Sequence, residues 1–585
     1  MGSGLANVAL GVGRSTNAST KGSQPANIIE FAESAWGIGM ELYPVQRVIL
    51  KVHYGLLLDD TKEFLVDTSW RLDKKVKFTE ASYLRYLYDE GRSNIREVVP
   101  GKERREMVLS IGRRSGKCIL GGSLVLTDKG ILRIDSLGDK EGDEFQPLQV
   151  TVAQEGRTQS ESKYFYNGGK KPCRILSTHC GYQLGGTDNH RIKIMGPEGV
   201  VDWKYLSDVT VGDKVAIHRN TDLWSQSYVD TKPFHNNRGY KEIEFPNRLD
   251  EKWGSLLGYL VGDGAWTRYN SVDITVEHPE TWDYLKKVYC DLFGSYQVGM
   301  DKRTANTGCI RFHSIGMRVF LDDLGFCIKT KRDEKKVPWA IMQSPKSVVC
   351  AFLRGLFETD GGVSKNGKVV EFSTASEQLA REIQTLLLNL GIISRVRPKV
   401  VKEKTYWILT VLGLRSRRTF MDLVGFDSHK KMDTLVKGLD GKFMEEGYVE
   451  SIPYQKPWTF KLLNSIPKSK KGWVRSRMSS VLGNIIKPSS NEDFTYSRMI
   501  NALALSEELG GNQSVIEHFQ HLLSIDYFYD SVEHIEESEP SVYDLTVPEG
   551  ESFVANGFVN HNTALSACIA AYETYKLILK ADPHS

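Results

Sequence analysis

The chain has 585 residues, of which 40% are hydrophobic and 25% charged, and its formal net charge is +3 at pH 7. This length exceeds what one hydrophobic core normally organises, so several domains are expected. No apolar run reaches the ~20 residues of a membrane helix, and the eight scattered cysteines lack the C-x-x-C spacing of a zinc ribbon. We therefore expect a modular cytoplasmic protein without a membrane segment, in which nucleic-acid binding would depend on local basic patches.

The N-terminal region has two parts with different composition. Residues 1–26 are rich in Gly, Ser, Asn and Ala and lack the pattern of a signal peptide, so we expect a disordered lead-in. Residues 27–117 follow and end in GRRSGK, which starts as a phosphate-binding loop. In such a loop backbone N–H groups hold the phosphates, and a Ser or Thr hydroxyl after the lysine binds Mg²⁺. Here Cys118 stands where that hydroxyl belongs.

The missing hydroxyl is found near the other end of the sequence. If residues 118–562 are removed, the sequence reads SIGRRSGKTALSACIAAYETYKLI, a complete loop followed by an amphipathic helix within 563–585. The sequence therefore predicts that 118–562 are an insertion. It also predicts that ATP and Mg²⁺ bind only after the insertion is removed, at Gly112, Gly116, Lys117 and Thr563.

The edges of the insertion carry residues that can cut and rejoin a backbone. Cys118 is its first residue, His561 and Asn562 are its last, and Thr563 follows it. Thiols and hydroxyls can attack carbonyl carbons, and an asparagine amide can attack its own backbone carbonyl. This arrangement resembles the boundaries of a class 1 intein, a protein segment that splices itself out of its host.

Internal blocks extend the resemblance along the insertion. LGGTDNHRIKI matches the T-x-x-H block of inteins, VGDKVAI matches their Gly-Asp block, and VYDLTV matches the block that carries an aspartate. Many inteins also have a histidine where this chain has Glu551, so Glu551 is left out of the expected catalytic set. The resemblance implies an all-β Hint splicing domain formed by 118–244 and 525–562. The catalytic residues that it implies are Cys118, Thr187, His190, Asp213, Asp544, His561, Asn562 and Thr563.

The resemblance also implies an order of reaction steps. Cys118 attacks the Lys117 carbonyl while His190 protonates the leaving nitrogen, and Thr563 then takes over the acyl group. Asn562 cyclises with the help of His561, and an ester-to-amide shift joins Lys117 to Thr563. Splicing itself requires no cofactor.

Two nonamers inside the insertion indicate a second activity. LLGYLVGDG and LRGLFETDG resemble the LAGLIDADG motif of homing endonucleases, which implies a monomeric α+β domain of αββαββα repeats over 245–440. Small residues four apart would let the two motif helices pack closely, namely Gly258 with Gly262 and Gly355 with Thr359. Asp263 and Asp360 would then meet at adjacent helix ends and bind Mg²⁺. An alternative is that the glycine after each aspartate simply ends a helix in the left-handed conformation.

Residues expected to contact DNA lie around and after these motifs. Lys335 in KKVP resembles a family lysine near the scissile phosphate, although an exposed charge before a turn explains it as well. Basic clusters occur at 395–402, 415–418 and 468–477, the last with Trp473. We interpret 441–524, which is helical by pattern, as an accessory DNA-recognition segment. The expected partner is double-stranded DNA, namely a homing site in the host gene without the insertion.

The segments on either side of the insertion resemble a phage terminase large subunit, an α/β P-loop ATPase that packages DNA. Tyr43, Pro44 and Gln46 match its aromatic-Pro-x-Gln feature, whereas Ile111 replaces the first glycine of the loop. The resemblance implies a small terminase and a portal as partners, in the cytoplasm of an infected bacterium. We expect only ATPase fragments in this chain, without the acidic residues for ATP hydrolysis or a nuclease domain.

Two other function classes compete with a splicing insertion that carries an endonuclease. One is a P-loop ATPase with an inert insert, in which Cys118 merely varies the loop. The other is an autoprocessing domain of the hedgehog type, which cleaves but does not ligate. Asn562 and Thr563 argue against the autoprocessing domain, because a domain that does not ligate has no use for both residues.

Overall fold

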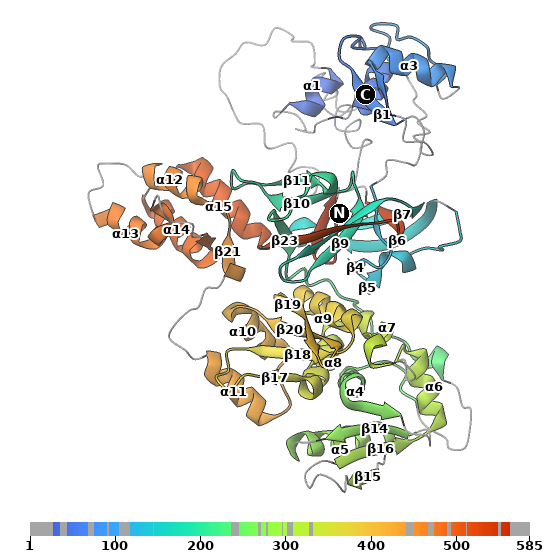
Figure 1. The fold of residues 1–585 in the computed structure, drawn as a ribbon, viewed down its shortest axis with the longest axis vertical. Helices are drawn as coiled ribbons and strands as arrows, with labels where there is room; N and C mark the ends of the chain where they lie inside the picture. The colour runs from blue at the N-terminus through green and yellow to red at the C-terminus, as the bar shows by residue number, and fades with distance from the viewer. Residues whose placement is uncertain are drawn as a thin grey trace, which may run out of the picture. The chain divides into compact units, whose positions relative to one another are not determined.

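The computed structural model describes residues 27–34, 42, 44–67, 75–90, 93–104, 117–143, 145–235, 245–266, 271–276, 279–294, 297–300, 308–326, 331–439, 448–465, 473–487, 493–509, 512–547 and 552–561 (Figure 1). These residues fall into two compact units, 27–104 and 117–561. Several residues predicted to act at the sites lie outside the described residues, namely Tyr43, Gly112, Gly116, Asn562 and Thr563.

The unit over 27–104 combines short helices with a hairpin. Its elements are α1 (Ile28–Glu33), α2 (Pro44–His53), β1 (Phe64–Asp67), β2 (Lys75–Phe78) and α3 (Glu80–Asp89). Pro44 opens α2, a position where the missing backbone N–H costs nothing. The buried Glu80 at the start of α3 accepts a hydrogen bond from Lys51 Nζ at 2.5 Å, which ties α3 to α2.

An antiparallel sheet of fourteen strands forms the body of 117–218 and 527–561. Its order is β11-β10-β12-β23-β8-β9-β3-β24-β7-β6-β4-β25-β26, with β5 beside β4. The last strand pairs back with β10 and β12, so the sheet closes on itself. The strands are β3 (Ile119–Leu120), β4 (Leu124–Thr127), β5 (Gly130–Arg133), β6 (Phe145–Ala153), β7 (Gln159–Lys170), β8 (Cys173–Thr178), β9 (Gln183–Thr187), β10 (Arg191–Met195), β11 (Val201–Tyr205), β12 (Lys214–His218), β23 (Tyr527–Ser538), β24 (Ser541–Thr546), β25 (Ser552–Ala555) and β26 (Phe558–His561).

Two repeats with the same element order follow this sheet in the chain. The first is α4 (Glu251–Asp263), β13 (Gly264–Trp266), β14 (Ser271–Val276), α5 (Pro279–Phe293), β15 (Gln297–Met300), β16 (Gly308–His313) and α6 (Ile315–Asp323). After the short α7 (Trp339–Met342), the second is α8 (Lys346–Asp360), β17 (Gly361–Val363), β18 (Val370–Thr374), α9 (Glu377–Asn389), β19 (Ser394–Val401), β20 (Lys404–Val411) and α10 (Leu414–Leu423). Their four-stranded sheets have the matching orders β13-β14-β16-β15 and β17-β18-β20-β19, as an αββαββα repeat requires.

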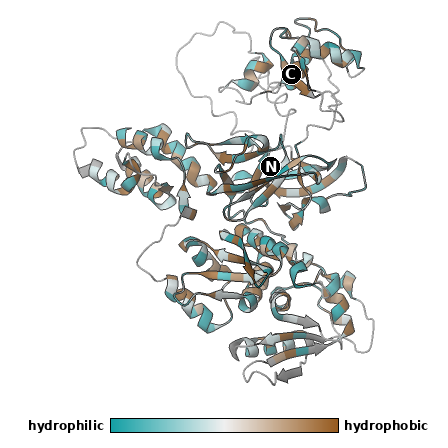
Figure 2. Ribbon diagram, in the orientation of Figure 1, coloured by the Kyte–Doolittle hydropathy of each residue, from teal (hydrophilic) through white to brown (hydrophobic). Residues whose placement is uncertain are grey.

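Helices dominate the remainder of the unit, as the sequence predicted for 441–524. They are α11 (His429–Leu439), α12 (Lys456–Ser465), α13 (Trp473–Leu482), α14 (Tyr496–Leu509) and α15 (Gln513–Ile525), with a two-strand ladder of β21 (Ser451–Ile452) and β22 (Phe494–Thr495). Hydrophobic and hydrophilic residues share the same helices, as amphipathic packing requires (Figure 2). Within the described residues, no helix is both long and apolar enough to cross a membrane.

Helix α9 packs directly against the fourteen-stranded sheet. Arg381 Nη1 donates a hydrogen bond to the Gly181 carbonyl at 2.6 Å, and Gln384 Nε2 donates to the Cys180 carbonyl at 2.9 Å. The Val396 N–H at the start of β19 donates to the same Cys180 carbonyl at 3.0 Å. The second repeat is therefore held to the β8–β9 turn by buried polar contacts as well as by apolar packing.

Candidate functional sites

Cys118 lies at the start of β3 and is completely buried. Its N–H donates to Thr187 Oγ1 at 3.1 Å, and its carbonyl accepts from the Thr187 N–H at 3.0 Å. Thr187 Oγ1 in turn donates to Asn189 Oδ1 at 3.0 Å. A Cβ on Gly186 would stand 2.8 Å from the Cys118 carbonyl, so the glycine allows the two strands to approach. The amide nitrogen of the Lys117–Cys118 bond is therefore held by a hydroxyl.

His190 joins the beginning of the insertion to its end. Its ring is completely buried, and Nε2 lies 2.9 Å from Oδ1 of Asn560, a residue of the last strand β26. Burial lowers the pKa of His190 to about 4, so the ring is neutral at physiological pH. Its Nδ1 has no hydrogen-bond partner among the described residues. Asn560 was not predicted from the sequence, because its role depends on a contact across 370 positions.

Lys117 and His561 lie within electrostatic reach of His190. Lys117 is only 7% exposed, and its positive charge helps to lower the pKa of both histidines. For His561 burial is the larger cause, and the pKa falls to about 3. The imidazole ring also contacts the edge of Trp203, with ring centroids 4.8 Å apart. The structure thus brings Cys118, Thr187, His190 and His561 into one buried region.

The two predicted aspartates differ in their surroundings. Tyr543 pairs with Ile119 in the β24–β3 ladder, so the next register step places Asp544 across from Cys118. Burial raises the pKa of Asp544 to about 8, so its carboxyl is protonated at neutral pH. Asp213 lies in the turn before β12, where its carboxylate accepts from the Thr210 N–H at 2.8 Å and from Lys204 Nζ at 2.7 Å. These contacts give Asp213 a role in the turn rather than beside the thiol.

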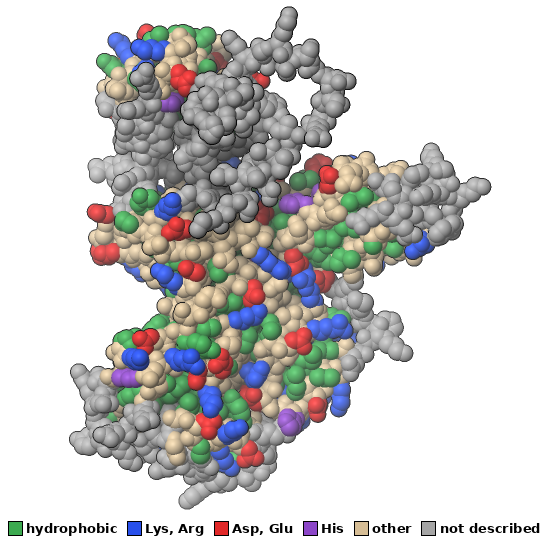
Figure 3. Space-filling view, turned by 180° about the vertical axis from the view of Figure 1, so that it is seen from behind, with side chains coloured by type: hydrophobic (Ala, Val, Ile, Leu, Met, Phe, Trp, Pro, Cys, Tyr) green, Lys and Arg blue, Asp and Glu red, His purple; other side chains and the backbone are tan. Residues whose placement is uncertain are grey.

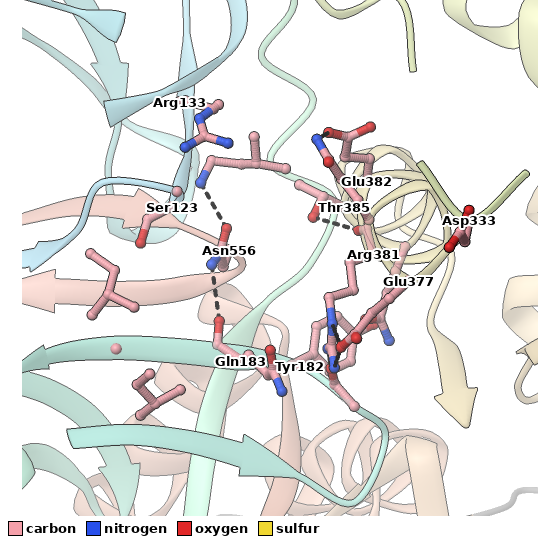
Figure 4. A pocket seen from close by; sticks show the side chains of 18 residues that line it. Ser123, Arg133, Tyr182, Gln183, Asp333, Glu377, Arg381, Glu382, Thr385 and Asn556 are labelled. Atoms are coloured by element: carbon pink, nitrogen blue, oxygen red, sulfur yellow. Dashed lines mark hydrogen bonds and ion pairs between the residues drawn. The ribbon is translucent and has the colours of Figure 1, made fainter. Parts of the chain in front are cut away.

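A turn asparagine fastens the final hairpin to the strands β4 and β9. Asn556, between β25 and β26, has a φ of +49°, which asparagine tolerates better than most residues. Its Oδ1 accepts from the Leu124 N–H at 2.7 Å, and its Nδ2 donates to the Gln183 carbonyl at 3.0 Å. Figure 4 shows Asn556 at a cavity of about 530 Å³, with Arg381 and other side chains of α9 also lining it.

The helices α4 and α8 pack with their backbones in contact, as the stripe of small residues predicted. A Cβ on Gly258 would stand 2.1 Å from the Phe352 carbonyl oxygen, and one on Gly355 would stand 2.5 Å from that of Ser255. A Cβ on Gly262 would overlap Thr359 Oγ1. The alternative of a left-handed glycine after each aspartate is wrong, because Gly264 and Gly361 have φ values of −69° and −104°.

Replacing Gly258 by Ala is expected to lower the free energy of unfolding by about 1–3 kcal/mol, because the added methyl forces the two helices apart. Urea unfolding of the full chain measures this change. Gly362→Ala is the matched control, since a Cβ there meets no atom within 4 Å. Equal unfolding midpoints for the two variants would show that α4 and α8 do not pack at this distance.

Asp263 and Asp360 are the last residues of α4 and α8. Burial, and then the charge of Asp263, raise the pKa of Asp360 to about 6. An exposed carboxylate and a half-buried one that repel each other, Asp263 and Asp360, are suited to hold a divalent cation. The pair supplies only part of an oxygen shell, so water and phosphate oxygens would supply the rest.

Two lysines contact the ends of these helices in a similar way. Lys335 Nζ donates to the Val261 and Gly262 carbonyls at 2.6 and 2.8 Å, and Lys431 Nζ donates to the Gly361 carbonyl at 3.1 Å. Lysines here also complement the negative ends of the helix dipoles. Burial lowers the pKa of Lys335, while Asp360 and Asp263 raise it. Lys335 was predicted from the sequence, whereas Lys431 lies in α11 outside both nonamers and was missed.

The predicted basic clusters are unevenly placed. In β19, Arg395 and Arg397 flank the buried Val396, and all residues from Arg397 to the end of the strand are exposed. In the view of Figure 3, Lys and Arg side chains are interspersed with acidic and hydrophobic ones over the described part of the face. Residues 468–472 of the predicted cluster over 468–477 lie outside the described residues.

Comparison with known families identifies one part of the chain. A family model for a LAGLIDADG-like domain matches residues 347–425, which run from α8 through α10 and include Asp360. The chain therefore contains a LAGLIDADG-like domain in its second repeat. The homing endonuclease I-DmoI, solved as mesophilic variants, aligns with 31% of this chain and 97% of that chain, at 17% identity and a TM-score of 0.25.

Curated proteins with unrelated names share a long stretch with this chain. This chain is 26% identical over 360 residues to the replication factor C small subunit of Methanocaldococcus jannaschii, and the alignment covers 60% of this chain and 18% of that protein. This chain is 26% identical over 500 residues to the replicative DNA helicase DnaB of Nostoc sp., and that alignment covers 80% of this chain and 52% of the helicase. The chain thus spans no more than about half the length of these relatives.

Proposed function

We propose that residues 118–562 are an intein with a Hint-type fold, which excises itself and joins Lys117 to Thr563. The observation that carries this proposal is the meeting of the two ends of the insertion in one buried region. The Cys118 amide is held by Thr187, and His190 of the same T-x-x-H block contacts Asn560 in the last strand. The contact between Leu124 and Asn556, 432 positions apart, holds the two ends together.

In the proposed first step the Cys118 sulfur attacks the Lys117 carbonyl. Amide resonance opposes this attack, and the leaving nitrogen needs a proton because it would otherwise depart as a strongly basic anion. The Thr187 hydroxyl orients this nitrogen at 3.1 Å. A protonated Asp544, with its pKa raised to about 8, can donate a proton at neutral pH, and His190 is the second candidate donor.

In the later steps the acyl group passes from Cys118 to Thr563, and Asn562 then cyclises. His561 precedes Asn562 directly, and its neutral ring can donate a hydrogen bond to the carbonyl that Asn562 attacks. Cleavage of the bond after Asn562 releases the insertion. The ester between Lys117 and Thr563 then rearranges to an amide, which is the more stable bond.

The curated relatives support an insertion that occurs in different hosts. The two flanks, 1–117 and 563–585, together hold fewer than half of the 360 residues aligned with the replication factor C small subunit. Most of that aligned stretch must therefore lie within 118–562. A segment shared by a replication factor C small subunit and a replicative DNA helicase is more easily explained as a mobile insertion than as a common catalytic core.

The intact mass of the freshly made chain tests splicing directly. We expect masses of the excised 118–562 and of the joined flanks, and only the full-length mass when Cys118→Ala and Asn562→Ala are combined. Separate, unjoined flanks would instead indicate an autoprocessing domain that does not ligate. A full-length wild-type chain that persists would indicate an inert insert.

We further propose that 245–440 form a homing endonuclease that cleaves double-stranded DNA with Mg²⁺. Asp263 and Asp360 would hold the metal, which polarises the phosphate and activates water when bound. Lys335 and Lys431, whose ammonium groups contact the ends of α4 and α8, would then approach the scissile phosphate. The segment 441–524 would extend the DNA-binding surface, and a monomer suffices because both repeats are in one chain.

For the flanking segments 27–117 and 563–585 we propose the ATPase of a phage terminase large subunit, which binds ATP with Mg²⁺ once splicing has joined them. Pro44, and the helix α2 that it opens, support the sequence match in this segment. The Hint-type domain would then comprise 118–244 and 525–562. The small terminase and the portal would be partners of the spliced host.

A further inference from the structure

We propose that Asn560 is a positioning residue of the splicing site, which fixes His190 in the tautomer that carries its proton on Nε2. This inference rests on the proposed splicing function. Both side chains are completely buried, and β10, which begins directly after His190, pairs with β26 through Ile192 and Asn560. The 2.9 Å contact between them is therefore shielded from water, and its two hydrogen-bonding roles are not interchangeable.

The neighbours of Asn560 determine which way its amide faces. Its Nδ2 lies 2.8 Å from the Phe558 carbonyl oxygen and 3.4 Å from that of Phe553. Carbonyl oxygens only accept hydrogen bonds, so the NH₂ group must face them and Oδ1 must face His190. Because Oδ1 also only accepts, His190 Nε2 must be the donor.

The remaining ring nitrogen then has a defined state. A neutral imidazole carries one proton, so with Nε2 protonated the Nδ1 atom presents a lone pair. Nδ1 has no partner among the described residues, and burial keeps the ring neutral. His190 therefore must accept a proton at Nδ1 before it can give one to the Cys118 nitrogen, which makes it an acceptor in the resting state.

Other groups around the ring do not fix the tautomer. The His190 N–H donates to the Thr187 carbonyl at 2.9 Å, and its carbonyl accepts from the Leu206 N–H at 2.8 Å, both through the backbone. The charged or titratable neighbours are Lys117 and His561, and the Lys117 charge disfavours a second proton on the ring. Asn560 is the contact that distinguishes the two ring nitrogens.

The tautomer can be observed by nitrogen NMR on the full chain labelled at histidine and trapped by Cys118→Ala and Asn562→Ala. We expect the nitrogen chemical shift of a protonated ring nitrogen for His190 Nε2 and that of an unprotonated one for Nδ1. The His190→Gln variant, which lacks these signals, assigns them. Asn560→Leu should give a mixture of tautomers. Asn560→Asp should keep the tautomer and move the His190 titration to higher pH, because a carboxylate stabilises the charged ring.

A rate measurement complements the spectra. In the Asn562→Ala chain, thiol-induced cleavage after Lys117 should slow roughly 10- to 100-fold with Asn560→Leu, and Asn560→Asp should restore part of the rate and shift its pH profile. Asn389→Leu is the matched control, since Asn389 is also buried but donates to the Leu223 carbonyl. It should leave the rate and the His190 signals unchanged.

The outcomes separate this inference from the function on which it rests. The role of Asn560 would be overturned, even if splicing proceeds, by an unprotonated His190 Nε2 in the trapped chain. It would also be overturned if Asn560→Leu left the His190 signals unchanged. A chain that never yields joined flanks would overturn the proposed function, whereas the spectra would still report the tautomer. If Asn560→Leu fails to fold, the titration of Asn560→Asp decides, because an unshifted His190 midpoint contradicts the proposal.

Discussion

Asp360→Asn is expected to reduce Mg²⁺-dependent DNA cleavage by at least ~100-fold while leaving protein splicing intact. The substitution keeps the shape of the side chain but removes the charge that would hold the metal. The environment of Asp360 indicates this function, because burial and the neighbouring Asp263 raise its pKa to about 6. Cleavage of a plasmid with the cognate site, and intact mass for splicing, measure the two activities on the same preparation.

Acidification, like Asp360→Asn, should reduce DNA cleavage. The carboxylate of Asp360 must be ionised to bind the metal, so cleavage at limiting Mg²⁺ should fall as the pH decreases through about 6. Protons and metal compete for the same group, so a higher Mg²⁺ concentration should move the midpoint to lower pH. Initial cleavage rates between pH 5 and 8 at two Mg²⁺ concentrations measure this shift.

A control aspartate at another helix end tests whether the loss of DNA cleavage is specific to Asp263 and Asp360. Asp323 is the last residue of α6 in the same domain and is exposed, so Asp323→Asn should leave cleavage unchanged. Asp263→Asn should match Asp360→Asn, because in the proposed site both carboxylates would hold the same metal. Loss of ligation in either metal-site variant, as complete as in Cys118→Ala, would show that the two activities share one site.

The two nonamers could be predicted from the sequence because each is a local pattern. The small residues Gly258 and Gly355 predicted the close packing of α4 and α8, since small residues four apart lie on one helical face. Thr187 and His190 were found because their block spans four positions. Asp213 was matched by its block equally well, but its carboxylate serves the turn around Thr210. A sequence match therefore located the residue without revealing its contacts.

Residues whose roles depend on distant pairing could not be predicted. Asn560 faces His190 only because β26 closes the sheet against β10, and no local pattern encodes that register. Lys431 reaches the end of α8 from α11, a helix outside both motifs. The docking of α9 on the β8–β9 turn likewise depends on residues some 200 positions apart. Such contacts depend on how distant strands and helices are arranged in the fold, and no local sequence pattern encodes that arrangement.

Before splicing, the host is expected to bind Mg-ATP at least ~100-fold more weakly than after it. Lys117, the lysine of the predicted phosphate-binding loop, is 7% exposed within the unit formed by 117–561. Its ammonium acts on the pKa of His190, His561 and Asp544, so it lies inside the splicing region and away from solvent phosphates. Cys118 is also followed directly by the strand β3, whereas a phosphate-binding loop requires a helix there.

Calorimetric titration of Mg-ATP into two forms of the full-length host measures this difference. One form contains 118–562 trapped by Cys118→Ala and Asn562→Ala, and the other is encoded without these residues, so that Thr563 follows Lys117. Lys117→Ala in the second form is the control, because it should weaken binding toward that of the trapped precursor. If the trapped precursor binds Mg-ATP as tightly as the uninterrupted host, the insertion does not interrupt a working loop. The boundary at Lys117 and Cys118 would then have to be abandoned, because a lysine buried beside His190 cannot also hold a phosphate.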